Sequence, residues 1–174
     1  RVTKACFEPA LDYCVVKIPR WDLKKFKNVS REIGSAMKSV GEVMAIGRRF
    51  EEALQKAIRM LEIGMDGLVQ NTQNGHENFE QELTQPTEQR VFIIPAALRN
   101  GISIDRIYEL SRIDKWFLYK INNVVEIEKQ LLDTGKKIPA ELLRQAKQYG
   151  FSDIQIGRAA GMIPQAVRDV RKKH

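Results

Sequence analysis

The spacing of apolar residues divides the chain into a mixed first part and a helical second part. Residues 50–64 read FEEALQKAIRMLEIG, and their apolar positions fall on one face of a helix: Phe50, Leu54, Ala57, Ile58 and Leu61. Glu51 and Glu52 stand in the first turn, where the helix dipole favours carboxylates, and Gly64 suits the end of the helix. The pattern therefore predicts a helix that begins at Phe50.

Beyond residue 86 the pattern predicts further helices and no strand, so this half of the chain is expected to be all-α. The expected helices are residues 88–98, which contain Pro95; residues 103–111, capped by Ser103; residues 114–133, with Leu118, Ile121, Val125 and Leu132 as their stripe and Gly135 beyond; residues 139–150, between Pro139 and Gly150; and a short pair within residues 151–174.

The first 48 residues have a different pattern. LDYCVVKIP, residues 11–19, is a β-branched apolar run that predicts a strand, and WDLKKFK after it suggests one helical turn. SREIGSAMKSVGEVMAIG, residues 30–47, holds three glycines that disfavour a long helix, so we expect a strand, a bend and a buried segment there.

A polar stretch separates the two parts. GLVQNTQNGHENFEQELTQP, residues 67–86, is rich in Asn and Gln and has no sustained apolar period, which predicts a loop or linker over about 69–86. His76 lies in it without a second His or a Cys nearby, so the sequence gives no reason to assign it to a metal.

Composition fits one domain, or one domain and a piece of another, because the 174 residues are 43% hydrophobic. Cys6 and Cys14 match no zinc or disulfide spacing, so we expect buried, reduced thiols in a cytosolic type of protein. No apolar run reaches transmembrane length and no signal peptide is evident. The first residue is Arg1, which suggests a processed product or an excised fragment.

The end of the chain raises the possibility of a helix-turn-helix DNA reader. Gly157 and Gly161 suit a tight crossing of two helices, and a second helix from Pro164 would present its polar side outward: Gln165, Arg168, Arg171 and Lys172. The net charge of +7 is in the wrong half, however, since residues 1–62 hold 13 Lys/Arg and 8 Asp/Glu, while residues 63–174 hold 16 and 14. Two packed helices with a solvated face are the favoured interpretation.

Motifs of catalysis are lacking. No phosphate-binding glycine loop, nucleophile elbow or HExxH occurs. The paired carboxylates Glu51/Glu52 and Glu80/Glu82 stand at positions predicted to face solvent or the linker, so we interpret them as solvated charge. Taken alone, the chain does not have the pattern of an enzyme.

One stretch is harder to explain. MKSVGEVMAIGR, residues 37–48, places Lys38 and Glu42 in an otherwise small and apolar run. A buried carboxylate there would need a partner or a water-filled path, whereas a surface turn would need neither. Pattern alone leaves both alternatives open.

Four segments resemble a known family. ACFEPALDYCVVKIPRW (residues 5–21), MKSVGEVMAIGR (37–48), RIDKWFL (112–118) and GFSD with QIG (150–157) closely resemble the large subunit of carbamoyl-phosphate synthase. The resemblance implies a mainly α fold, in which residues 1–61 are the α/β tail of the first ATP-grasp unit, which forms carboxyphosphate. Residues 62–174 would be the helical oligomerisation domain.

The resemblance also implies a chemistry for the parent enzyme. Such enzymes make carbamoyl phosphate from bicarbonate, glutamine-derived ammonia and two ATP, with Mg and K ions, for arginine and pyrimidine synthesis. Met37 and Glu42 match positions that line the internal carbamate tunnel, where few polar groups protect a reactive intermediate from water. Glu42 would order water there or pair with a cation from a distant segment.

The ATP-binding residues of the family would lie upstream of Arg1 and downstream of His174, so we expect the isolated chain to bind no ATP or metal and to catalyse nothing. The resemblance implies self-association as a dimer or tetramer, contacts with the rest of the large subunit and with a glutamine amidotransferase, and no nucleic-acid or membrane partner. The cytoplasm is the expected compartment, with mitochondria possible for some relatives.

Two groups of apolar residues have alternative roles in such a domain. Trp116 and Phe117 are candidates for the subunit contact, although a place in the core is favoured for them. The packed faces of the last two helices are expected at Ile156, Ala159, Ala160 and Val167.

Overall fold

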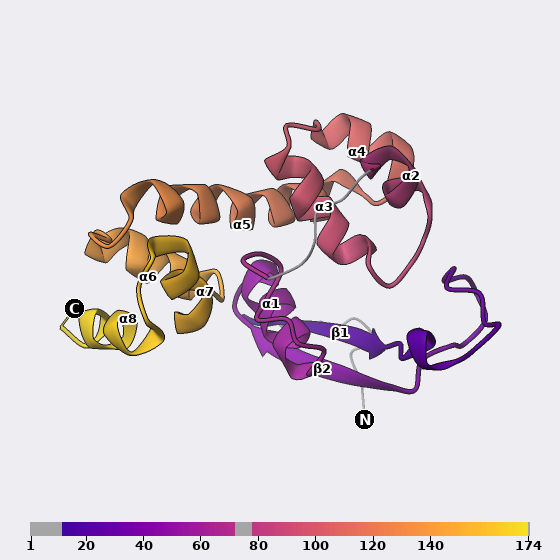
Figure 1. Cartoon of the computed structure of the whole chain (residues 1–174), viewed down its shortest axis with the longest axis horizontal. Coiled ribbons are helices and arrows are strands. Elements are labelled where there is room, and N and C mark those ends of the chain that lie inside the picture. Colours follow the sequence, from indigo (N-terminus) through magenta and orange to yellow (C-terminus); the bar gives the residue numbers. More distant parts are fainter. Residues whose placement is uncertain (1–11, 72–77, 174) are drawn as a thin grey trace, which may run out of the picture.

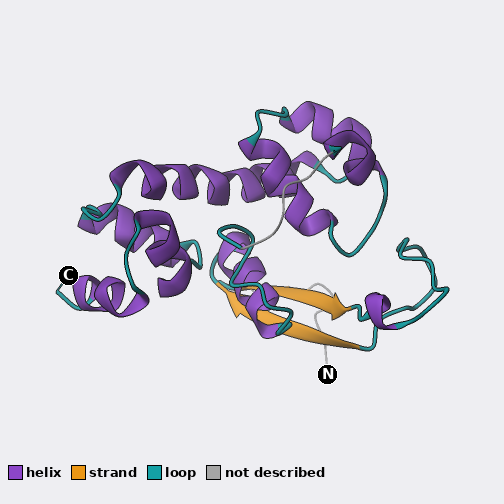
Figure 2. Cartoon of the chain, in the orientation of Figure 1, coloured by secondary structure: helices purple, strands orange, loops and turns teal. Residues whose placement is uncertain are grey.

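The computed structural model describes residues 12–71 and 78–173, and it confirms a mainly α fold with a short strand-containing tail (Figures 1 and 2). The tail contains β1 (Cys14–Arg20), a 3-10 turn η1 (Leu23–Lys25) and β2 (Gly41–Gly47). The helices are α1 (Phe50–Met60), α2 (Phe79–Thr84), α3 (Arg90–Arg99), α4 (Ile104–Ser111), α5 (Lys115–Thr134), α6 (Ala140–Gln148), α7 (Asp153–Ala160) and α8 (Pro164–Arg171).

The two strands pair antiparallel, in a register that runs from Cys14 opposite Gly47 to Arg20 opposite Gly41. Residues alternate between the faces of a strand, so Val16 and Ala45 turn toward α1, which covers one face of the sheet (Figure 1). Val15 and Met44 are exposed on the other face. The first predicted strand is confirmed. The expected buried segment before Gly47 is wrong, because one whole face of β2 is uncovered.

Helix α5 is the axis of the helical part. Near its start it contacts α3 and α4, and farther along it contacts α6 and α7 (Figure 1). Its predicted range and its end before Gly135 are confirmed. Leu132 does not belong to the buried stripe, since it is 49% exposed while Leu131 is fully buried. The packing partners change along the helix, and the buried face shifts with them.

The predicted linker is only partly a loop. Helix α2 lies inside it, with Asn78 as N-cap accepting from the backbone N–H of Gln81 at 3.2 Å and with Leu83 fully buried. At the other end Leu68 and Val69 are buried as well. A six-residue helix with one buried side chain shows no apolar period, so its pattern is that of a loop.

Two of the residues discussed above stand in segments that the structure does not describe. Cys6 and His76 lie outside the described residues. Cys14 is a half-buried free thiol in β1, and burial, together with the charges of Glu52 and Glu51, raises its pKa. No helix within residues 12–71 and 78–173 has the length and apolar content needed to span a membrane.

Buried side-chain amides join α1, which covers the sheet of the tail, to the rest of the helical part. Gln155 of α7 donates to the side-chain oxygen of Gln55 in α1 at 2.9 Å and to the backbone oxygen of Val69 at 3.1 Å. Gln55 donates in turn to the backbone oxygen of Tyr149 at 2.9 Å. Both glutamines are fully buried, so α1 is fixed to the helical part by directional bonds as well as by apolar packing.

A strap from the tail adds a second junction. The backbone N–H of Ile33 donates to the oxygen of Pro86 at 2.6 Å, and Glu32 forms an isolated β-bridge with Thr87. The guanidinium of Arg31 binds the carboxylate of Glu88. The loop between η1 and β2 therefore reaches the segment in front of α3.

Candidate functional site

Aromatic rings gather where α1 and α5 begin. Phe50 packs edge to face against Trp116 and Phe117, with ring centroids 5.4 Å apart in each case, and Trp116 and Phe117 are 5.0 Å apart. Tyr108 of α4 and Tyr119 of α5 belong to the same region, because the Lys115 ammonium lies over the ring of Tyr108 and Lys115 stands one helical turn before Tyr119 on α5. We name these five residues the aromatic surface.

Trp116 and Phe117 are not core residues. Trp116 is 51% exposed and Phe117 42%, so the expectation that both lie in the core is wrong. The next residue, Leu118, is fully buried and occupies the position that faces the core. At the first turn of α5 the two rings stand beside the buried side of the helix, where Phe50 covers them only in part.

Lysines and carboxylates border the aromatic surface in pairs. The Lys115 ammonium lies 5.2 Å from the ring of Tyr108 and 2.6 Å from a carboxylate oxygen of Asp105. The Lys120 ammonium lies 5.3 Å from the ring of Trp116 and 3.7 Å from a carboxylate oxygen of Glu51. Each cation that touches a ring therefore has a carboxylate of its own chain as partner.

Glu51 is buried, contrary to the expectation that it faces solvent. Its Oε1 accepts a hydrogen bond of 2.8 Å from the Asn123 side chain, and Lys120 supplies the nearby positive charge. Helix periodicity gives the position of Glu51 on α1 but not the approach of α5 to that position. The residues next to Glu51 in the sequence do not indicate this contact.

The two residues matched to the carbamate tunnel lie at the surface. Met37 is 91% exposed in the bend before β2. Glu42 lies on the uncovered face of β2, where its carboxylate is 2.8 Å from the Lys17 ammonium of β1 and both side chains are more than half exposed. Among the described residues nothing covers that face of the sheet, so Glu42 is an exposed carboxylate paired with Lys17.

The last two helices pack as a pair. Their expected packed residues are buried in the structure: Ile156, Ala159, Ala160 and Val167. The Cα of Gly157 lies against the turn between the helices, where a Cβ would stand 2.5 Å from the backbone oxygen of Met162. The small residue is therefore needed for the tight crossing.

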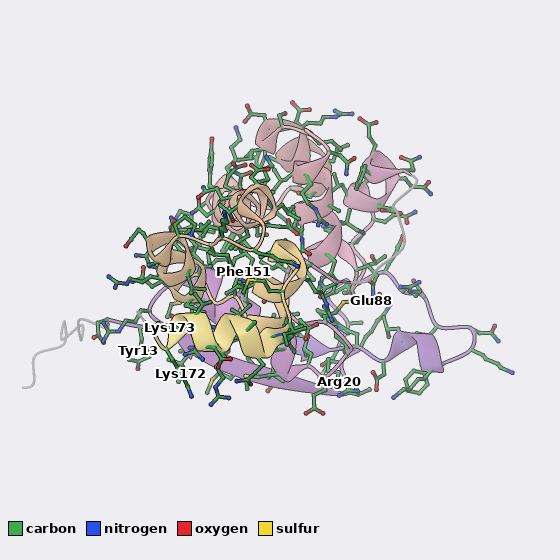
Figure 3. All side chains as sticks on the ribbon, turned by 60° about the vertical axis from the view of Figure 1, so that its left-hand side comes forward. Tyr13, Arg20, Glu88, Phe151, Lys172 and Lys173 are labelled. Carbon is green, nitrogen blue, oxygen red and sulfur yellow. The ribbon has the colours of Figure 1, made fainter. Side chains whose placement is uncertain are left out.

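Two basic residues around α7 and α8 share one carboxylate. Asp153 receives Lys147 at 2.8 Å and Arg171 at 3.2 Å, and Gln165 donates to Asp169 at 3.0 Å. Partial burial acts to raise the pKa of Asp153, but the bonds and charges of Lys147 and Arg171 outweigh it and lower that pKa. Lys172 and Lys173 lie at the end of α8 (Figure 3). Nothing in this arrangement favours a DNA reader.

A cavity of about 330 Å³ lies at the junction of tail and helices. Arg20, Asp22 and Lys25 line it from the tail, and Glu88 and Phe92 line it from the helical side; Figure 3 marks Arg20 and Glu88. The charges that line it have partners: Lys25 lies 2.7 Å from Asp22, Arg20 donates to the oxygen of Leu61 at 3.0 Å, and Glu88 binds Arg31. Within the described ranges no group of three His, Cys, Asp or Glu side chains could hold a metal ion.

Exposed aromatic rings and a two-stranded sheet with one uncovered face are features of domains that contact other protein surfaces. The family model described as the oligomerisation domain of the carbamoyl-phosphate synthetase large chain matches residues 42–174. The chain therefore belongs to that family, as its sequence motifs predicted.

Curated relatives support the assignment over the whole chain. It is 53% identical over 174 residues to the multifunctional protein pyr1-3 of Dictyostelium discoideum and 51% identical over 175 residues to the multifunctional protein URA2 of Saccharomyces cerevisiae. It is 48% identical over 175 residues to the mitochondrial carbamoyl-phosphate synthase (ammonia) of Aquarana catesbeiana. These alignments cover 98%, 99% and 97% of the chain, but only 8%, 8% and 12% of the relatives.

Proposed function

We propose that this chain is the association and connecting segment of a carbamoyl-phosphate synthase large chain. The match of the oligomerisation-domain model to residues 42–174 carries the proposal. The exposed aromatic surface supports it, because a monomeric domain gains nothing from leaving a tryptophan half exposed. The parent would be an ATP-dependent ligase that forms carbamoyl phosphate from bicarbonate, glutamine-derived ammonia and two ATP.

The molar mass of the chain in solution tests its association. Light scattering across a concentration series should show a dimer or tetramer that dissociates on dilution, since a domain that associates by itself obeys mass action. A constant monomer mass up to the highest soluble concentration contradicts the proposal.

The uncovered face of the sheet suggests how the tail is used. A two-stranded sheet is marginal by itself, and Val15, Met44 and Ile46 form an apolar row on the face away from α1. We propose that the remainder of an ATP-grasp unit covers this face in the parent, and that Met37 and Glu42 then line the path of the carbamate. Lys17, 25 positions before Glu42 in the chain and 2.8 Å from it, is the cation that would hold its charge.

Replacing Glu42 by alanine in the full-length parent enzyme tests this role. Alanine would leave space for water in the wall and would leave the Lys17 ammonium without its partner, so carbamate should hydrolyse in transit and more ATP should be consumed per carbamoyl phosphate formed. The matched control is Glu126→Ala, since Glu126 is another exposed carboxylate paired with a lysine, at 2.9 Å, but lies on α5. An unchanged ratio of ATP consumed to product formed in the Glu42 variant refutes the role.

ATP and its Mg and K ions are assigned in this proposal to parts of the parent other than the described residues, which offer no metal-binding cluster. The product would serve pyrimidine and arginine synthesis. We propose the cytoplasm as the compartment; the mitochondrial relative shows that the same domain also occurs in an organelle. The amidotransferase and the other large-chain domains are the proposed partners.

A further inference from the structure

We infer that Lys38 is a positioning residue for the wall of the proposed carbamate path: its ammonium ties the bend that carries Met37 to the strap that docks on the helical part. We call residues 30–33 the strap and residues 34–37 the bend. The inference rests on the proposed function, since it takes Met37 and Glu42 as parts of that wall. Lys38 is the second charged residue of the MKSVGEVMAIGR segment, and nothing in the proposed function uses it.

The ammonium of Lys38 bonds to main-chain oxygens of the strap. It donates to the oxygen of Ser30 at 3.1 Å and to the oxygen of Glu32 at 2.7 Å. Lys38 is half-buried, while the residues of the bend just before it are all exposed. An ammonium has three N–H donors and no acceptor, so two nearby carbonyl oxygens are suitable partners for it. The side chain therefore folds back over its own loop and does not extend into solvent.

The strap is itself fixed to the segment in front of α3. The backbone N–H of Ile33 donates across this junction at 2.6 Å, and Glu32 forms a β-bridge there. Arg31 binds the carboxylate of Glu88, whose side chain is only 9% exposed. An ion pair with one buried partner is screened less by water and salt than a pair of exposed side chains. The helical part therefore sets the position of the strap.

The bend has few other ties. Among the described residues, neither the backbone nor the side chains of residues 34–37 take part in a hydrogen bond. The next backbone bond along the chain is donated by Val40 to the last residue of β1 at 2.9 Å. A Cβ added at Gly34 would meet nothing within 4 Å, and Met37 is 91% exposed, so packing does not hold the bend either. Lys38 therefore supplies the bonds that lie nearest to Met37.

Position matters in a wall that has to exclude water. Met37 has a flexible side chain with three rotatable bonds, so its place depends on the backbone that carries it. Glu42 is held independently, because Lys17 lies 2.8 Å from its carboxylate across the sheet. If the bend were released, Met37 would leave the wall while Glu42 stayed in it, and water would reach the carbamate. The bonds of Lys38 thus make one wall residue depend on the helical part.

The test compares three lysine variants of the full-length parent enzyme. Lys38→Met removes the ammonium and keeps an unbranched apolar stem, whereas Lys38→Arg keeps a cation that can donate to both oxygens. Lys27→Met is the matched control, since Lys27 is an exposed lysine of the same loop and has no hydrogen bond or ion pair among the described residues. Glu42→Ala is measured beside them as the reference for the proposed path.

Two quantities are measured with glutamine as the nitrogen source and with no nitrogen source, respectively. The first is the ATP consumed per carbamoyl phosphate formed, which rises when carbamate is lost on the way. The second is the rate of bicarbonate-dependent ATP turnover, which falls when a substitution damages the first ATP-grasp unit itself. A substitution in a surface loop should leave the second quantity nearly unchanged.

We expect Lys38→Met to raise the ratio of ATP to product about twofold or more, and Lys38→Arg and Lys27→Met to keep it within about 1.3-fold of the parent value. The rescue by arginine separates a positioning role of the cation from a general effect of changing residue 38.

Two results overturn the inference while the proposed path stands: Glu42→Ala raises the ratio and Lys38→Met does not, or Lys38→Arg raises it as much as Lys38→Met. If neither Glu42→Ala nor Lys38→Met changes the ratio, the proposed path fails first, and the inference fails with it.

Discussion

Replacing Gln155 by leucine should weaken the joint between α1 and the helical part. The buried side chain of Gln155 makes four hydrogen bonds. It donates to Gln55 at 2.9 Å and to the oxygen of Val69 at 3.1 Å, and it accepts from the backbone N–H of Ser152 at 3.0 Å and, more weakly, from the Arg59 guanidinium at 3.5 Å. Leucine has a similar volume and can replace none of these bonds.

The expected loss follows from the groups left behind. Gln55 is fully buried and Val69 nearly so, and a buried polar group that loses its partner costs about 1–3 kcal/mol. The larger apolar surface of leucine returns about 1 kcal/mol. Two such groups cost about 2–6 kcal/mol together, so the free energy of unfolding should fall by about 1–5 kcal/mol, and each kcal/mol lowers the Tm of a domain of this size by about 2–4 °C.

Urea unfolding followed by far-UV circular dichroism measures this loss. Gln148→Leu is the control, because Gln148 is an exposed glutamine of α6 and its replacement should change stability by less than about 0.5 kcal/mol. The double variant with Gln55→Leu should lose less than the sum of the two single losses, since the same bond is broken twice. A loss below about 1 kcal/mol for Gln155→Leu refutes the reasoning.

Two further predictions concern α5 and α7. Burial raises the pKa of Glu128, against the charge of Arg99 at 3.1 Å and a hydrogen bond of 2.7 Å from Gln70. The folded state therefore keeps this proton to higher pH than the unfolded state, and the parent chain loses stability as the pH rises from the unfolded pKa through the raised folded pKa. Glu128→Gln does not titrate, so its free energy of unfolding should rise relative to that of the parent chain over the same pH range. A pH-independent difference between the two in urea titrations would be inconsistent with this. Gly157→Ala should lower the free energy of unfolding by about 1–3 kcal/mol, because the new Cβ would stand 2.5 Å from the backbone oxygen of Met162. Gly34→Ala is the control and should be nearly neutral, because nothing lies within 4 Å of its Cβ. Equal Tm values for the two variants would show that the α7–α8 crossing is not tight.

Much of the local structure followed from the sequence. Ser103 caps α4 as expected, and Ser152 caps α7 in a capping box that Gln155 completes. Gly161 ends α7 with a left-handed φ of 66°, which glycine adopts without strain. These features depend on residues within one turn of each other, and the residue types are sufficient to predict them.

The candidate site was only partly within reach of the sequence. Trp116 and Phe117 were recognised as candidates for a contact, but a core position was favoured, because apolar residues in a helix are buried more often than not. The exposure of these rings depends on where α3 and α4 end relative to α5. The role of Phe50 as the third ring was not foreseen, since a distance of 66 residues in sequence separates it from Trp116.

The sequence by itself determined the family, the positions of the helices other than α2, the cap of α4 and the faces of α7 and α8, because these depend on residue types at short spacings. Only the tertiary structure decided which polar groups are buried. It placed Glu51 beneath α5, Gln55 against Gln155, and Glu42 on an uncovered strand beside Lys17. Burial of a polar group depends on neighbours that are distant in the chain, and a local sequence pattern does not identify those neighbours.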